Sequence, residues 1–538
     1  MSRNLRAHGA AALPFFRLKL AIVIMRGHLC ACVSIKYPEN KKICYRNVFC
    51  FCLKRVEKLV ALPARKHALA YFCLRGFHAS FSLGASQPGS GVKILKFVFL
   101  KEYLRQKLLL IGLRQPMPVI QLASIITAPN PGLFKEKINH SFEAGRRGKP
   151  DELESILANR IAAYFLEKDR LARFDLRISG TVHNGRPLVR VSGEVSAHLI
   201  SGPGAESDIF GIILAAYNRI HRTSLPRSGI EVNFNFKPQS PKLAQNGRAG
   251  DSGEPIAVAY SKSPNFLPWE RYLAVELRDM FDWIYQHNGR IPARLSKASG
   301  VSSLAGLRAD GKIQVNASYS GTELEEITSI TVALEHEKDL GIGRLRSKAI
   351  ALIYYKLGLL EAKYGLRNGR LGFPHLVVNG CGAFPAGGWL ADEGTREAKP
   401  YRDGFATYGV MEDSFSGEDS SKPSGTGTML ARHIAVSIVG NGLAGFARVA
   451  LSYVIGKEGV ELNITTNGTS LLPQAELESI VRGNFDLSLS GAAESFGLRN
   501  PDTFLKIAAN SDYFHDKNYF WNKAMPLPGG PNGPKKSM

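Results

Sequence analysis

Charged side chains suited to binding a phosphate ligand are concentrated between residues 387 and 422. Asp392, Lys399, Glu418 and Lys422 lie there in glycine-rich backbone. Backbone N–H groups exposed by glycine, together with nearby charged side chains, are what a site for a highly charged phosphate requires. A solvated loop of mixed charge has the same composition, so this stretch alone leaves both interpretations open.

The net charge of +23 is concentrated at the N-terminus. Residues 1–130 hold 21 Lys and Arg against three acidic residues, so they carry +18, and the remaining 408 residues carry +5. A nucleic-acid-binding protein has a basic face on its folded domain. Because the rest of this chain is close to balanced, we expect no nucleic acid as a partner.

Cysteines are concentrated in the same N-terminal part. Six of the seven precede residue 80, and only Cys381 follows it. The two C-x-C pairs lack the C-x-x-C spacing of a zinc ribbon and have no histidine pair nearby, so we predict no zinc site there. A single cysteine in the body of the chain permits no disulfide framework, which is typical of a reducing compartment. We therefore expect a cytoplasmic protein.

Residues 1–130 show no sustained helical or alternating period. The apolar run 11–25 is interrupted by Arg17 and Lys19 and is too short to span a bilayer, so we expect no membrane partner. We interpret residues 1–130 as a basic extension that is disordered or belongs to a non-native start, with Met117 as the alternative start. A targeting segment is the second interpretation, since acidic residues are scarce and arginines are abundant.

From Ile138 onward the apolar residues follow regular periods. Residues 153–165 have apolar positions at helical spacing, and Pro150 and Asp151 suit the first turn of that helix. Helices and strands then alternate, which predicts an α+β protein of three similar blocks, each a sheet with helices on one face. The further helices are expected at 207–222, 269–287, 345–364, 428–443 and 474–481, and the strands at 189–195, 230–236, 312–319, 328–335, 376–378, 449–455 and 460–465.

The segment from Gln239 to Gly253 has no apolar period and contains three glycines. Loops of this composition between rigid elements are where active-site lids are usually found. We therefore predict that residues 239–253 form a mobile loop, with Gln239 at its beginning.

Several fragments together resemble S-adenosylmethionine synthetase (methionine adenosyltransferase) of the bacterial and eukaryotic type. They occur in the family's order over about 380 residues, from Phe142 to Trp521. Each fragment is weakly specific, but the ordered set is difficult to obtain by chance. The fragments are GKPDE at 148–152, QSP at 239–241, AGDSG at 249–253, RADGKIQV at 308–315, GGWLADEG at 387–394, SFSGEDSSK at 414–422 and LARHIAVSIV at 430–439.

The resemblance implies three repeated α+β domains in a pseudo-threefold arrangement, which we place at 131–248, 249–386 and 387–530. It implies a homodimer or homotetramer with active sites at the dimer interface. It also implies that methionine sulfur displaces the triphosphate of ATP, which is then cleaved to phosphate and pyrophosphate. Sulfur is already a good nucleophile, so such a site orients two substrates and stabilises the leaving group with Mg²⁺, K⁺ and cationic side chains.

The resemblance assigns a role to each matching position. Lys149, Asp392 and Lys399 are the expected catalytic residues, and Asp151 is the expected Mg²⁺ ligand. The expected ATP-binding residues are Lys149, Asp310, Gly311, Lys312, Phe384, Asp392, Lys399, Ser414 and Glu418. The expected methionine-binding residues are Glu194, Gln239, Asp251, Asp392 and Lys422.

Eight positions depart from the family pattern. Lys149 stands where the family has its catalytic histidine, Glu418 replaces a phosphate-binding lysine, and Arg177 stands at the position of the K⁺-binding glutamate. The charge changes cancel over the eight positions, so two hypotheses follow: a rewired pocket in an active enzyme, or drift in an inactive or regulatory family member that binds nucleotide or pairs with an active subunit. The other five departures are Glu152, Lys242, Ala383, Ala398 and Ser424.

Overall fold

The computed structural model describes residues 137–531 except 202–203, 241–247, 366–370, 372–373, 396–403, 410–413 and 458, and it also describes the backbone of four N-terminal strands. The chain divides into two units, Met1–Pro131 and Gly132–Met538.

The first unit contains a four-stranded antiparallel sheet with the strand order β3-β2-β1-β4. The sequence did not predict these strands, because their apolar residues do not alternate regularly. They are rich in β-branched and aromatic residues, which favour the extended conformation even without a period. The rest of the proposed extension 1–130 lies outside the described residues. The strands are β1 (Arg17–Met25), β2 (His28–Glu39), β3 (Lys42–Lys54) and β4 (Phe72–Leu74).

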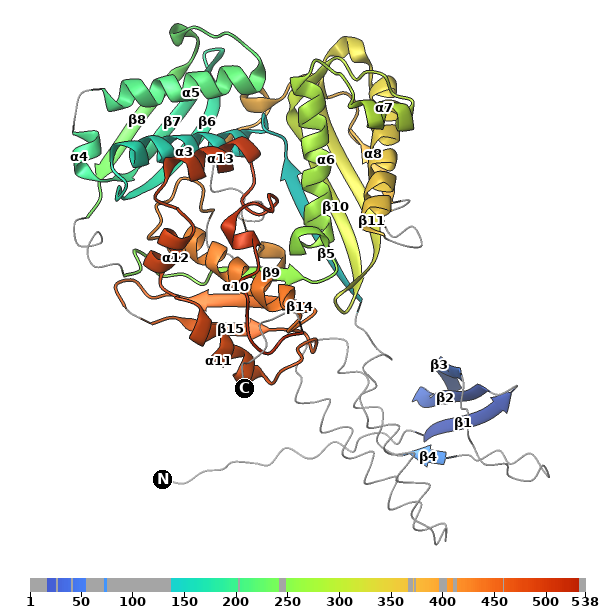
Figure 1. The fold of residues 1–538 in the computed structure, drawn as a ribbon. Helices are drawn as coiled ribbons and strands as arrows, with labels where there is room; N and C mark the ends of the chain where they lie inside the picture. Colours follow the sequence, from blue (N-terminus) through green and yellow to red (C-terminus); the bar gives the residue numbers. More distant parts are fainter. Residues whose placement is uncertain are drawn as a thin grey trace, which may run out of the picture. The chain divides into compact units, whose positions relative to one another are not determined.

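The second unit is an α+β structure with three sheets, each packed against helices (Figure 1). The first sheet has the order β13-β6-β7-β8. Helices α3 and α5 pack together and share one core with it. Its elements are α3 (Pro150–Lys168), β6 (Phe174–His183), β7 (Arg186–Val195), α5 (Ala205–His221), β8 (Glu231–Pro238) and β13 (Gly394–Thr395).

The second sheet has the order β12-β11-β10-β5. Helices α6 and α8 lie side by side against it, joined by a hydrogen bond between the Tyr272 and Tyr364 hydroxyls (2.8 Å) and an ion pair between Lys356 and Glu276 (2.5 Å). Its elements are β5 (Lys137–Gly145), α6 (Trp269–Gln286), α7 (Ala293–Ser299), β10 (Leu307–Ser320), β11 (Glu323–His336), α8 (Ile342–Tyr364) and β12 (His375–Val378).

The third sheet has the order β15-β14-β9, and α10 packs on it. The C-terminal helix α13 instead packs against α3, where Phe504 joins the core of the first sheet. The elements of this part are β9 (Ile256–Tyr260), α10 (Thr428–Gly440), β14 (Phe446–Ser452), β15 (Glu461–Thr465), α11 (Gln474–Asn484), α12 (Leu489–Ser495) and α13 (Pro501–Asn510).

An edge strand of each sheet comes from elsewhere in the sequence. Strand β5, which precedes α3, pairs with β10 of the second sheet, and β9, which precedes α6, pairs with β14 of the third. Strand β13 pairs with β6 of the first sheet. All three pairings are antiparallel. Each pairing joins strands of two different proposed domains, so the sheets cross the proposed boundaries at 248/249 and 386/387. The division into three domains stays a prediction.

The six long helices predicted from apolar period are confirmed as α3, α5, α6, α8, α10 and α11. The expected strands correspond to β7, β8, β10, β11, β12, β14 and β15. Strands β5, β6, β9 and β13 and the helices α4 (Ala197–Ile200), α7, α12 and α13 were not predicted. Short segments contain too few residues for a period to stand out, which explains the omission of β9, β13 and the helices. Strands β5 and β6 are nine and ten residues long, and the alternation of Phe174, Leu176 and Ile178 in β6 was overlooked.

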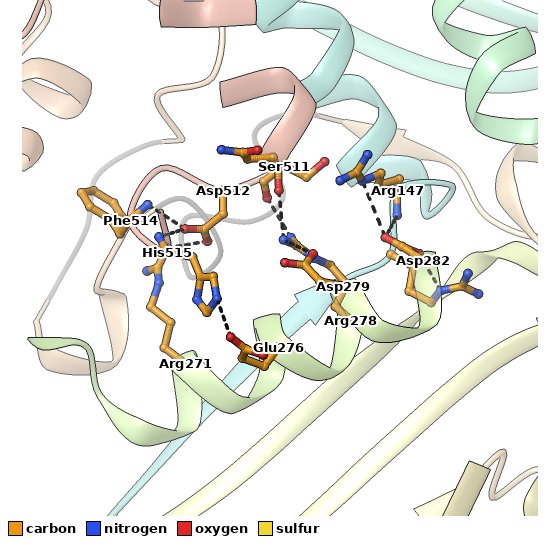
Figure 2. Close-up of polar contacts among 12 residues, drawn as sticks. Arg147, Arg271, Glu276, Arg278, Asp279, Asp282, Ser511, Asp512, Phe514 and His515 are labelled. Carbon is orange, nitrogen blue, oxygen red and sulfur yellow. Dashed lines mark hydrogen bonds and ion pairs between the residues drawn. The ribbon is translucent and has the colours of Figure 1, made fainter. Parts of the chain in front are cut away.

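Buried charge ties α6 to the C-terminal segment 511–515. Figure 2 shows Arg271, Glu276 and Arg278 of α6 projecting toward Ser511, Asp512 and His515. Arg271 forms an ion pair with Asp512 (3.0 Å), and Arg278 donates to the Ser511 carbonyl (2.8 Å). Both arginines are almost fully buried. These contacts hold the end of the chain against the second sheet's helix.

Candidate active site

The first cluster of predicted site residues lies where the N-terminus of α3 meets β10. The N–H of Gly148 donates to the Ala309 carbonyl (3.2 Å), which fixes the segment before the helix on the strand. Lys149 is the N-cap residue of α3, and its Nζ donates to Asp151 Oδ2 at 2.7 Å. The sequence thus brings a cation and a carboxylate together at a helix N-terminus, where backbone N–H groups favour anions.

The turn Gly388–Leu390 (η7) closes over this cluster. The Gly388 N–H donates to Asp310 Oδ2 (2.7 Å), and the Glu335 carboxylate accepts from the N–H groups of Asp310 (2.9 Å) and Gly387 (3.1 Å). Gly388 has φ of 59°, a left-handed conformation that a side chain disfavours. Two acidic side chains therefore hold the glycine pair in place.

Burial raises the pKa of Asp310 and of Glu335 above their ordinary values. For Asp310 the N–H groups of Gly388 and Gly311 and the charge of Lys149 oppose this effect. The two carboxyls also repel each other, because the charge of Asp310 further raises the pKa of Glu335. Glu335 also belongs to this cluster, although it was not among the predicted site residues.

A column of aromatic rings supports the same turn. The Trp389 ring stacks on Tyr217 (5.3 Å between centroids), which in turn contacts the ring of His221 (4.4 Å). Trp389 Nε1 donates to Glu154 Oε1 at 2.7 Å, and any side chain at Gly180 would collide with the indole. Burial lowers the pKa of His221 to about 4, so this imidazole is neutral at pH 7. None of these rings was predicted to belong to the site.

The second cluster surrounds a cavity of about 230 Å³. Lys422 Nζ lies 2.7 Å from Asp251 Oδ2 and 3.2 Å from Asp175 Oδ2. Arg177 pairs with the other oxygen of Asp175, and the backbone of Asp175 bridges to that of Glu418. Predicted methionine-side and phosphate-side residues thus share one cavity.

The carboxylates that surround Lys422 in this cavity determine its pKa. Burial lowers the pKa of Lys422, but Asp251, Asp175 and Glu418 outweigh burial and raise it above its ordinary value. The lysine is therefore fully protonated at any physiological pH. Asp175 was not predicted, although it alternates with the buried Leu176 of a strand and so shares a face with Arg177.

The other predicted residues are distributed between and beside the two clusters. Glu194 lies opposite Asp175 in the pairing of β6 with β7, and Gln239 is buried next to the end of β7. The Lys312 side chain is 46% exposed and pairs with Glu143 at 2.9 Å. The remaining predictions divide as follows: the Phe384 carbonyl accepts from His336 at the end of β11, Asp392 is exposed beside η7, Ser414 is buried, and Lys399, Ala398 and Lys242 lie outside the described residues.

Helix α3 contacts both the first cluster and the segment that leads to Glu418. Asp151 lies in its first turn, and Asn159, one of its middle residues, accepts from the Gly417 N–H at 3.3 Å. These two residues of α3 lie about 12 Å apart along the helix axis.

Within the described residues, no three His, Cys, Asp or Glu side chains are grouped so that they could hold a metal ion by themselves. The helices of the described part also include none that is long and apolar enough to cross a membrane.

Comparison with known proteins matches the C-terminal part of the chain to a family. Residues 386–523 match the S-adenosylmethionine synthetase C-terminal domain. The S-adenosylmethionine synthase of Aquifex aeolicus (strain VF5) is 27% identical over 398 residues, which cover 72% of this chain and 96% of that protein. Together these matches support a divergent S-adenosylmethionine synthetase.

Two further relatives of the same name give the same picture. The S-adenosylmethionine synthase of Desulforudis audaxviator (strain MP104C) is 26% identical over 412 residues, 71% of this chain and 94% of the relative. That of Helicobacter pylori (strain J99) is 26% identical over 401 residues, 72% of this chain and 97% of the relative. The similarity to this chain thus extends over nearly the full length of these relatives.

Two residues that the resemblance places at departures from the family pattern contact each other, because the Ser424 hydroxyl donates to Glu418 Oε2. A third such residue, Arg177, pairs with Asp175.

Proposed function

We propose that this protein is a methionine adenosyltransferase that forms S-adenosylmethionine from ATP and L-methionine and releases phosphate and pyrophosphate. The observation that carries the proposal is the pairing of Ser424 with Glu418 across two departures from the family pattern. A buried carboxylate introduced by random drift would often lack a suitable hydrogen-bond donor, which costs free energy. A hydroxyl that donates to Glu418 is expected where selection has kept the site.

In this proposal the first cluster holds the triphosphate. Lys149 would donate to a phosphate oxygen, and the backbone N–H groups at the start of α3 would add to the favourable field. Asp151 fits a Mg²⁺ ion carried by the nucleotide, because Mg²⁺ in such sites takes one or two carboxylates and completes its shell with phosphate oxygens and water. That ion would neutralise charge on the leaving group.

The second cluster would hold methionine. Asp251 would accept from the substrate ammonium, while Lys422 would attract its carboxylate; the two side chains lie 2.7 Å apart. Gln239 places a shielded side-chain oxygen at the beginning of the predicted loop, and that oxygen has no hydrogen-bond partner in the described part of the chain. Orientation of the sulfur toward the nucleotide then supplies most of the catalysis, since no protein nucleophile is needed.

We also propose a homodimer or homotetramer of three-domain subunits with pseudo-threefold symmetry. The cyclic exchange of edge strands β5, β9 and β13 among the three sheets supports the repeat. The resemblance to S-adenosylmethionine synthetases supports a site completed by a second copy. Light scattering of the purified protein measures the assembly, and a monomer at all concentrations would contradict it.

The test of the function is a product assay on the full-length protein with ATP, methionine, Mg²⁺ and K⁺. We expect S-adenosylmethionine by chromatography, with phosphate and pyrophosphate in equal amounts. Asp151→Asn should reduce the rate by at least about tenfold, because it removes the charge that the metal needs. Absence of all three products at high protein concentration would overturn the proposal.

A second candidate function is a regulatory family member that binds nucleotide without catalysis. It is favoured by the acidic lining of the second cavity, where Asp175, Asp251, Glu254 and Glu418 outnumber Arg177 and Lys422. An anionic substrate is disfavoured there by net negative charge. ATP binding by calorimetry with no product from the protein alone, together with a changed rate of an active relative when the protein is added, distinguishes this candidate.

Exchanging the paired substitutions should reveal their coupling. We expect Glu418→Lys alone to lower kcat/KM by about 10-fold to 100-fold, because a third cation then faces Arg177 and Lys422. Ser424→Asp alone should also be harmful, because it faces the Glu418 carboxylate. The double variant should recover much of the loss, which corresponds to a coupling energy of about 1–3 kcal/mol.

The matched control for this cycle is the exposed ion pair Lys262–Glu323 (2.8 Å). Exchanging its charges singly and together should change kcat/KM by less than about twofold in every case. If the losses of Glu418→Lys and Ser424→Asp simply add in the double variant, the two positions do not act as a pair and the main support for a rewired site is lost.

A further inference from the structure

The second cavity contains a continuous line of alternating charges. It begins at Arg177, passes through Asp175 and Lys422, and ends at Asp251. Asp175 uses one carboxylate oxygen for Arg177 and the other for Lys422 (3.2 Å). One carboxylate therefore positions two cations on the same wall of the cavity.

Burial makes this arrangement rigid. The side chains of Asp175 and Lys422 are 15% and 11% exposed, and Arg177 is 40% exposed at the mouth. Ion pairs of long, exposed side chains contribute little, but a carboxylate held between two cations in a partly buried wall fixes their positions. The strand β6 supplies both Asp175 and Arg177, so their spacing is set by the sheet.

The side chains at this wall do not fit a potassium ion. The family resemblance implies K⁺ at the position of Arg177, and alkali and alkaline-earth cations take a shell of oxygen ligands. Here a guanidinium occupies the position and a second cation, Lys422 Nζ, lies on the other side of Asp175. The two positive charges on either side of Asp175 oppose a further cation at this wall.

We infer that Arg177, held by Asp175, supplies the fixed positive charge of this site and that the protein works without a bound monovalent cation. Asp175 is a positioning residue, since it acts through Arg177 and Lys422. The inference rests on the proposed function for its role in the reaction. The replacement of the ion by a side chain is a property of the site that can be measured separately.

Lys422 supports this arrangement from the inner side. Burial lowers the pKa of Lys422, but the facing carboxylates of Asp251, Asp175 and Glu418 have the larger effect and raise it above its ordinary value. The other groups at the cavity are Glu254, Ser252 and Ser424, of which only Glu254 carries charge. The two cations thus remain charged over the physiological pH range.

The first test compares product formation in KCl, NaCl and tetramethylammonium chloride at equal ionic strength. We expect rates within about twofold of one another, because the fixed cation is part of the chain. Activation by K⁺ of about tenfold or more over both other salts would overturn the inference while leaving the proposed function intact.

The second test needs no activity. Arg177→Glu restores an oxygen donor next to Asp175 and should create a K⁺ response: the melting temperature in KCl should exceed that in NaCl by about 2 °C or more. The full-length unsubstituted protein should show no such difference. Arg186→Glu is the matched control, because this exposed residue lies on β7 about 20 Å along the strand from Ser192, which pairs with Arg177.

The role of Asp175 is tested through substrate kinetics. Asp175→Asn should raise KM for methionine by about tenfold with a smaller change in kcat, because Arg177 and Lys422 lose their common anchor. Asp175→Glu should restore part of the affinity, which a purely structural role would not require. An unchanged KM in Asp175→Asn would exclude the positioning role.

The two tests separate the two hypotheses. If no salt yields product but Arg177→Glu gains the K⁺ response, the proposed function fails and the inference about the fixed cation stands. If product forms with strong K⁺ activation and the melting temperature of the unsubstituted protein rises selectively in KCl, the inference fails. If Arg177→Glu and Arg186→Glu respond to KCl alike, the effect is not specific to the cavity and the inference is likewise overturned.

Discussion

Replacing Asp512 by alanine should lower the free energy of unfolding by about 3–5 kcal/mol. The carboxylate is buried between α6 and the C-terminal segment (Figure 2). Its Oδ2 pairs with Arg271 at 3.0 Å, and its Oδ1 accepts from the N–H groups of Phe514 and His515, both at 2.6 Å. The truncation leaves one buried cation and two backbone donors without their acceptor. Urea denaturation measures the change.

The size of this loss depends on Arg271, which is also buried and cannot shed its charge. Asp512→Asn retains an acceptor for the backbone but not the negative charge. Its free energy of unfolding should therefore lie between those of the unsubstituted protein and Asp512→Ala. Asp502→Ala is the matched control: it removes an exposed acid from the neighbouring α13 and should cost less than about 0.5 kcal/mol. A loss below about 1 kcal/mol for Asp512→Ala would mean that the ion pair does not hold the segment.

The same carboxylate makes stability depend on acid pH. Burial raises the pKa of Asp512, but Arg271, Arg278, His515 and the Phe514 N–H outweigh burial and hold it below its ordinary value. A group with a depressed folded-state pKa contributes its stabilisation above the unfolded-state pKa, about 3.9 for aspartate. That contribution is lost as the pH falls through the folded-state pKa. Asp512→Asn should therefore show a shallower loss of stability below about pH 4 than the unsubstituted protein.

Local patterns in the sequence were sufficient to predict the long helices. The start of α3 at Pro150 follows from a fixed proline φ and an acid in the first turn, both local properties. Likewise Glu194 falls within a strand as expected, because β7 is marked by alternating valines. The general fold class, α+β, follows from the same alternation of helices and strands.

The pairing of distant strands was beyond such reasoning. Nothing local in residues 137–145 indicates that they join β10 rather than β6, which follows them directly in the sequence after α3. The choice depends on which apolar faces meet across more than 160 residues, and one sequence carries no record of that contact. For the same reason the buried partners of Arg271 and Arg278 could not be predicted; a charged residue on an amphipathic helix is usually exposed.

The candidate site was predictable in composition but not in its connections. Lys149 and Asp151 lie two residues apart, so their pairing at the start of α3 could be expected from spacing. Asp175 could also have been found, because Phe174, Leu176 and Ile178 alternate with it in β6. Glu335 and the Trp389 column could not, since the contact of Glu335 with Gly387 and those of Trp389 with α3 and α5 exist only in the folded chain.

Lys422 to alanine should be the most harmful single change in the second cavity. Its Nζ lies within 3.2 Å of two carboxylates, and Glu418 is a third acid near enough to raise its pKa. Removing the lysine leaves these acids facing one another and a negatively charged substrate group without its cation. We expect kcat/KM for S-adenosylmethionine formation to fall by about 100-fold to 1,000-fold, as for the loss of one main oxyanion donor.

The same variant should lose methionine affinity in calorimetry, which separates a binding defect from a chemical one. Lys422→Arg keeps the charge but changes the donor geometry. Its kcat/KM and methionine affinity should therefore lie between those of the unsubstituted protein and Lys422→Ala. Lys262→Ala, which removes an exposed lysine paired only at the surface with Glu323, is the matched control and should change kcat/KM by less than about twofold. If Lys422→Ala retains the rate within about threefold, substrate charge is not neutralised at this cavity, and the methionine site must lie elsewhere on the chain.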